Sequence, residues 1–220
     1  MASSPGNEMN RFVAEAVRAF DRLRDAQRNA GLQPYDPAEQ DGSRLYFRTK
    51  YREGIEQGRA NWRSRGEWSG YAIDWAHGGG YEVVFTRKPE RSSKRAESVQ
   101  AIFTRLEDAA KFIIANVGDS LRVDDGLQTL FLIWQDLGLD ERISKTAPAE
   151  AECQRMIDLL PPGKEDLVRK HLEKFVLGAV PDVQSIGFPG VRPYMNVMPI
   201  TYGDLENQLL DGTGNPRGKA

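Results

Sequence analysis

Hydrophobic and polar residues follow two different periods along this chain, and the change between them marks the expected elements. Apolar side chains recur at three- and four-residue steps over residues 7–30, which predicts one long amphipathic helix. Strand-type alternation then takes over, and in one run Tyr71, Ile73 and Trp75 share a face. The expected strands cover residues 44–51, 67–76, 81–88 and 98–103, with a weaker one near 60–63.

A run of glycines joins two of these strands. The sequence His77-Gly78-Gly79-Gly80 lies between residues 67–76 and 81–88, and a glycine turn makes an antiparallel hairpin the simplest pairing. The chain then returns to helical periods. Thr104 and Glu107 have capping-box spacing, which predicts a helix that starts at Thr104 and ends at Gly118.

Further helices are expected in the second half of the chain. Asp124 and Asp125 suit the start of a helix over residues 124–137, which Gly138 stops. The proline-interrupted stretch 183–203 disfavours a central strand. The remaining expected helices cover residues 149–160, 164–177 and 203–210.

These elements predict an α+β fold, with an antiparallel β-sheet meander packed on amphipathic helices and a C-terminal helical extension. Residues 1–145 are expected to form the α+β domain, residues 146–210 the helical extension packed on it, and residues 211–220 a flexible tail.

Composition adds limits on location. A single cysteine, Cys153, excludes an internal disulfide framework and fits a reducing compartment. The N-terminus lacks the pattern of a secretory signal, and no apolar run is long enough to cross a bilayer. We therefore expect a cytoplasmic protein with no membrane association.

The sequence carries no recognisable catalytic set. The two histidines, His77 and His171, have no metal-ligand partners at a suitable spacing. The glycine run resembles an esterase oxyanion loop, but no nucleophile-elbow sequence accompanies it. Asp119, Asp124 and Asp125 do not have the spacing of a calcium loop. We expect no enzymatic activity, no metal and no cofactor, although an enzyme whose carboxylates converge only in the fold stays open.

Charge and aromatic residues suggest a binding surface. Residues 44–95 carry 12 Lys or Arg against 6 Asp or Glu, whereas the chain beyond them has an acidic excess. Such a basic, aromatic sheet face suits an acidic protein partner. It also leaves open a nucleic-acid or phosphate-ligand binding domain, although a sequence pI of 5.8 disfavours that alternative. Its stacking residues would be Trp62, Trp68, Tyr71 and Trp75.

Four short motifs carry a resemblance to a known family. They are W-S-G-Y at Trp68–Tyr71, G-G-Y-E-V at Gly79–Val83, F-T-R-L-E-D-A-A at Phe103–Ala110 and G-D-S-L-R at Gly118–Arg122. Together, over residues 44–137, they resemble the bacterial immunity proteins paired with NAD-glycohydrolase toxins of the tuberculosis necrotizing toxin type.

The resemblance implies a cytoplasmic antitoxin that binds a cognate protein toxin and blocks its nucleotide cleft. By that analogy, the glycine turn from Ala76 to Gly80 is the inserting element. The residues expected to contact the toxin are Arg63, Arg65, Trp68, Tyr71, Trp75, His77, Gly78, Gly79 and Gly80.

Overall fold

The computed structural model describes residues 5–56, 68–75, 79–88 and 96–213. Within these ranges, eight strands form one open sheet in the order β1-β2-β3-β4-β5-β8-β7-β6, and each neighbouring pair is antiparallel. The expected strand near residues 60–63 lies outside the described residues. The strands are β1 Glu39–Asp41, β2 Arg44–Thr49, β3 Trp68–Asp74, β4 Tyr81–Lys88, β5 Ala96–Phe103, β6 Ile143–Thr146, β7 Glu173–Leu177 and β8 Gln184–Gly187.

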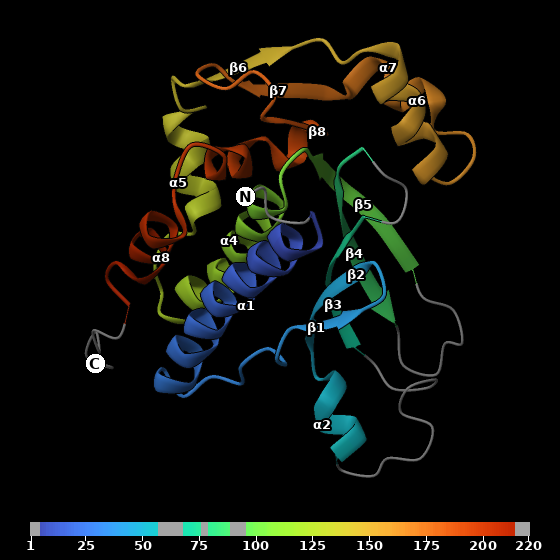
Figure 1. The fold of residues 1–220 in the computed structure, drawn as a ribbon. Helices are drawn as coiled ribbons and strands as arrows, with labels where there is room; N and C mark the ends of the chain where they lie inside the picture. The colour runs from blue at the N-terminus through green and yellow to red at the C-terminus, as the bar shows by residue number, and fades with distance from the viewer. Residues whose placement is uncertain (1–4, 57–67, 76–78, 89–95, 214–220) are drawn as a thin grey trace.

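Helices cover the two faces of this sheet unequally. One face packs against α1 and α4, and the remaining helices on that side pack around α4 (Figure 1). The α6–α7 pair lies on the other face, over β5 and β8, where a smaller apolar cluster contains Ile102 and Ile186. The helices are α1 Pro5–Asn29, α2 Tyr51–Glu56, α4 Leu106–Asp124, α5 Leu130–Leu137, α6 Glu150–Leu159, α7 Glu165–His171, the 3₁₀ segment η1 Pro189–Val197 and α8 Tyr202–Leu210.

The α+β class and the antiparallel meander are therefore confirmed. The long N-terminal helix, the hairpin of β3 and β4, α6 and α8 lie close to where the sequence places them. Tyr71, Ile73 and Trp75 do share a face, and all three contact the main core. Within the described ranges, none of the helices combines the length and apolar character that crossing a membrane requires.

The capping box predicted at Thr104 is wrong. The N-cap of the helix is the next residue, Arg105. Arg105 forms an ion pair with Asp108 through two hydrogen bonds of 2.7 and 2.8 Å. The Thr104 hydroxyl instead donates to the Asp182 carbonyl and accepts from the Gln184 amide, both at 2.9 Å. Thr104 therefore joins β5 to β8 and does not cap α4.

The predicted boundary between the next two helices is also wrong. Gly118 lies inside α4, where an added Cβ would come within 2.5 Å of the Leu209 side chain, so this glycine serves close helix packing. Asp124 ends α4, and α5 begins only at Leu130. The carboxylate at the start of α5 comes from Asp119, which accepts the Leu130 and Phe131 amides at 2.6 and 3.0 Å.

The predicted helix over residues 164–177 is shorter in the structure. It ends at His171, and residues Glu173–Leu177 form β7, in which Phe175 and Leu177 alternate into the main core. The expectation against a central strand near residues 183–203 is wrong as well, because β8 lies between β5 and β7. Its four residues contain no proline, and Pro189 begins η1 just beyond it.

Gly70 in β3 is required by the closeness of β2. A Cβ at this position would lie 2.3 Å from the Phe47 carbonyl oxygen and 2.7 Å from the Arg48 Cα. Both of these are backbone atoms of a paired strand, so neither can move aside without disturbing the sheet. The glycine of the W-S-G-Y motif is therefore explained by sheet geometry.

Replacing Gly70 with alanine should destabilise the fold by about 1–3 kcal/mol, the usual cost of overpacking. Chemical denaturation followed by circular dichroism measures the change. Gly190→Ala is the matched control, because an added Cβ there meets nothing within 4 Å. Equal stabilities for the two variants would contradict this account of Gly70.

Candidate functional site

The candidate site is the turn between β3 and β4, together with the groups that hold it. Gly79 has φ +70° and Gly80 has φ +145°, conformations that residues with a side chain rarely adopt. A Cβ on Gly80 would also come within 2.7 Å of the Phe103 carbonyl oxygen. The sequence Gly79-Gly80 is thus dictated by the backbone, and Gly79 is exposed at the surface.

A side chain from α6 braces this turn. Arg155 donates from Nη1 to the Gly79 carbonyl at 2.7 Å and from Nη2 to Glu82 Oε1 at 2.9 Å. The Glu82 side chain is 3% exposed, so the ion pair is largely shielded from water. The turn is consequently held between its own hairpin and a helix more than 70 residues away in sequence.

The three aromatic residues expected at the site lie on different faces of β3. Tyr71 and Trp75 point toward the helices, and the Tyr71 hydroxyl lies 3.4 Å from Asn116 Oδ1. Burial, with a smaller effect from Tyr35, raises the pKa of Tyr71 to about 12. Trp68 lies on the opposite face and is 4% exposed. Of the three, Trp75 lies nearest the turn in sequence and is half-buried.

Four other expected contact residues lie outside the described residues, namely Arg63, Arg65, His77 and Gly78. The structure therefore brings together Gly79, Gly80 and the adjoining Trp75. It adds Glu82 and Arg155, which the sequence analysis missed. Glu82 alternates with apolar residues in its strand, which signals a charged side chain on the second face, but no sequence feature links it to Arg155.

The face of the sheet away from α1 and α4 carries a paired polar cluster. Arg44 contacts Asp74 at 2.5 Å and Glu97 at 3.1 Å. Since β3 and β4 lie between the strands of Arg44 and Glu97, a flat sheet would separate those strands by roughly 14 Å. The Arg44 and Glu97 side chains therefore meet across this face, over β3 and β4.

Arg48 is the second arginine of this face. Its guanidinium lies 3.7 Å from the Tyr51 ring centroid and 4.8 Å from that of Tyr46, and it pairs with Glu39. Arg44 and Arg48 thus each have a carboxylate partner. In the part of the face that the structure describes, these two arginines offer little uncompensated positive charge for a phosphate.

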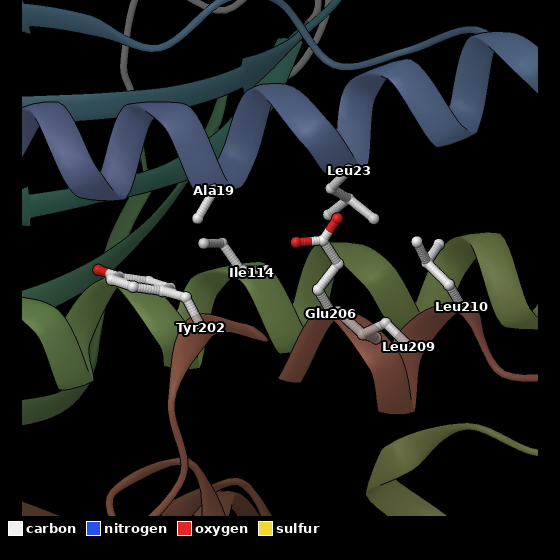
Figure 2. Close-up of a pocket in the computed structure, with 7 residues that line it drawn as sticks. All are labelled: Ala19, Leu23, Ile114, Tyr202, Glu206, Leu209 and Leu210. Atoms are coloured by element: carbon white, nitrogen blue, oxygen red, sulfur yellow. The ribbon is translucent and has the colours of Figure 1, made fainter. Parts of the chain in front are cut away.

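Figure 2 shows a separate cavity between α1, α4 and α8. Its volume is about 10 Å³, which is at the lower limit for one water molecule. The Glu206 carboxylate at its edge pairs with Arg22. We interpret this cavity as a packing gap. Among the described residues, no group of three or more His, Cys, Asp or Glu side chains is arranged to hold a metal ion.

Comparisons with known proteins show no family for this chain. No protein-family model matches the chain, and no curated protein sequence matches it. Among solved structures, the chain is similar to Rv3902c from M. tuberculosis, with 15% sequence identity and a TM-score of 0.48. The similarity covers 89% of this chain and 90% of the other.

Removing the brace should cost stability. Arg155→Gln leaves the buried Glu82 carboxylate without one charged donor, which we expect to destabilise the fold by about 2–3 kcal/mol. The double variant Glu82→Gln/Arg155→Gln should be closer to the parent than the sum of the two single variants, as for any coupled pair. Urea denaturation of all four proteins measures this coupling.

Arg169→Gln is the control for this series, because Arg169 and its partner Glu150 are both exposed and their pairing should contribute nothing measurable. If Arg155→Gln proved as stable as Arg169→Gln, Arg155 would not be a brace.

Proposed function

We propose that this protein is an immunity protein that binds a cognate toxin, an NAD-degrading enzyme, and blocks its active-site cleft. The observation that carries the proposal is the braced glycine turn. Gly79 is exposed, its conformation is fixed, and Arg155 occupies its carbonyl from one side. The motif resemblance supplies the class of partner, and the proposal places the protein in the cytoplasm, where it would protect cellular NAD.

A braced backbone without side chains suits insertion into a narrow cleft. Binding costs free energy when a loop must be ordered, and a loop that is already ordered avoids most of that cost. Arg155 holds the described end of the turn before any partner arrives, with one hydrogen bond to Gly79 and one to Glu82 in the adjoining strand. The absence of Cβ atoms on Gly79 and Gly80 lets a partner approach the backbone closely.

The flanking side chains have different parts in this proposal. The half-buried Trp75 adjoins the turn and would anchor it, because large aromatic residues dominate binding hot spots. The buried Trp68 and the half-buried Tyr71 support β3 from its two faces and so hold the hairpin in place. Arg63, Arg65, His77 and Gly78 retain the contact roles that the family resemblance gives them.

The alternative of a nucleic-acid or phosphate-ligand binding domain gains no support from the described residues. Arg44 and Arg48 are the basic residues that project from β2 on the face away from α1 and α4, and both are paired with carboxylates. A strong dependence of ligand binding on salt concentration would be the mark of that alternative.

The test begins with capture of the partner from the source cells by the tagged full-length chain. We expect a stoichiometric protein that consumes NAD once it is released, and whose NAD consumption stops when the purified chain is added back. Nucleic acid in its place, or a partner without effect on NAD, would contradict the proposal.

Gly79→Phe should weaken this inhibition about tenfold or more, the factor that corresponds to about 1.4 kcal/mol of lost binding energy. The Cβ of a phenylalanine there would lie 3.1 Å from Arg155 Nη1, so the ring would displace the brace or bulge from the inserting backbone, and either change alters the inserting surface. Inhibition constants from NAD-consumption assays give the comparison. Gly163→Phe is the control, because Gly163 also has positive φ, +84°, and lies in the turn between α6 and α7 with nothing near its Cβ. Equal inhibition by both variants would rule out insertion of the turn.

A further inference from the structure

A second candidate binding surface lies where α4 ends and α5 begins. An open hollow of about 470 Å³ is bounded by residues of α4, α5 and η1. It contains no residue of the glycine turn, so it is independent of the proposed toxin site. The hollow is lined by Asp119, Ser120, Val123, Asp124, Thr129, Phe131 and Tyr194.

The walls of this hollow are aromatic and apolar. The Phe131 and Tyr194 rings lie against each other with centroids 5.3 Å apart, and Val123 is 59% exposed. Leu132 and Leu137 add exposed apolar surface on α5. In the part of the chain that the structure describes, these two and Val123 make up half of the exposed large hydrophobic side chains. The exposed Val123 and the two rings form the apolar part of the hollow, and exposed apolar surface of this kind is typical of an interaction site.

The charged groups of the hollow are acidic. Asp119 lies at its inner end and accepts hydrogen bonds from two α5 amides and from the Tyr194 hydroxyl at 2.9 Å. Burial raises the pKa of Asp119 despite these bonds and the nearby Arg122. Asp124 is exposed at the rim, and no ion pair is found for it among the described residues.

No basic side chain lines the described part of the hollow to balance these carboxylates. Arg122 is buried and donates to backbone carbonyls, and its charge offsets that of Asp119. Its acceptors are the carbonyls of Gln128, Gln208, Leu209 and Asp211. The exposed Asp124 is therefore the carboxylate at the rim of this aromatic hollow for which the described residues provide no ion pair.

We propose that this hollow binds an arginine side chain of a protein partner, flanked in that partner by apolar residues. A guanidinium stacks on aromatic rings and pairs with carboxylates, and its methylene stem packs on apolar surface. Phe131 and Tyr194 provide the rings, the exposed Asp124 the charge, and Val123 the apolar rim. Arginine is also among the residues that most often dominate protein interfaces.

The test uses the isotope-labelled full-length chain and two capped tripeptides, acetyl-Leu-Arg-Leu-amide and the same peptide with neutral citrulline. We expect the arginine peptide to shift the amide signals of residues 119–124 and 129–131, with a half-saturating concentration about tenfold below that of the citrulline peptide. Equal effects of the two peptides, or no shift at these residues, would overturn the proposal.

Two variants localise the binding. Asp124→Asn should weaken binding of the arginine peptide about threefold, the usual effect of losing one exposed charge pair. Asp166→Asn, an exposed position on α7, should leave that affinity unchanged. Phe131→Leu keeps an apolar residue but removes the ring, and should also weaken binding. Unchanged affinity in both Asp124→Asn and Phe131→Leu would overturn the site.

Two further experiments test whether the hollow binds something other than a protein partner. If free arginine bound as tightly as the tripeptide, the hollow would be a small-molecule site and the proposal would fail. The chain also has its own basic residues near the C-terminus, Arg217 and Lys219. If the full-length Arg217→Gln/Lys219→Gln variant bound the arginine peptide about tenfold more tightly, its own tail would be the occupant. Unchanged affinity in that variant supports a partner.

Discussion

The pairing of β5 with β8 is the constraint on which the rest of this structure depends. Three residue pairs join them, Ala101 with Gly187, Ile102 with Ile186 and Phe103 with Ser185. Both faces of the junction are buried, since Ala101 and Phe103 enter the main core while Ile102 and Ile186 enter the cluster beneath α6 and α7. Through this junction, β6, β7 and β8 become part of one sheet with the N-terminal meander.

That junction also positions the candidate site. It brings α6 beside the turn between β3 and β4, so that Arg155 can reach both Gly79 and Glu82. A turn held on a rigid sheet and braced from a distant helix has the properties of a binding element whose shape is set in advance. The acidic hollow at α4 and α5 depends on the same core, because Tyr194 of η1 reaches Asp119 across it.

Much of this fold follows from the residue pattern. Alternation of Tyr71, Ile73 and Trp75 with smaller residues gives β3 its orientation, and the glycine run gives the hairpin. Local signals failed where a distant contact competed with them. The Thr104 hydroxyl bonds to β8 rather than to its own helix, and Gly118 accommodates Leu209 rather than ending α4.

The candidate site shows the same division. The conformations of Gly79 and Gly80 could be expected from their sequence, because only glycine adopts them easily. Arg155 could not be linked to them, since its role arises only when β8 joins the sheet and carries α6 into place. Phe175 and Leu177 illustrate the reason, because their short apolar pattern fits a helix or a strand until the pairing of β7 with β6 and β8 decides it.

Amide hydrogen exchange across residues 79–82, in the free chain and in its complex with the captured partner, tests the central claim most directly. If the braced turn is the element that enters the partner's cleft, exchange at these residues should slow strongly on binding. Unchanged exchange at the turn, with protection confined to another part of the chain, would contradict the account.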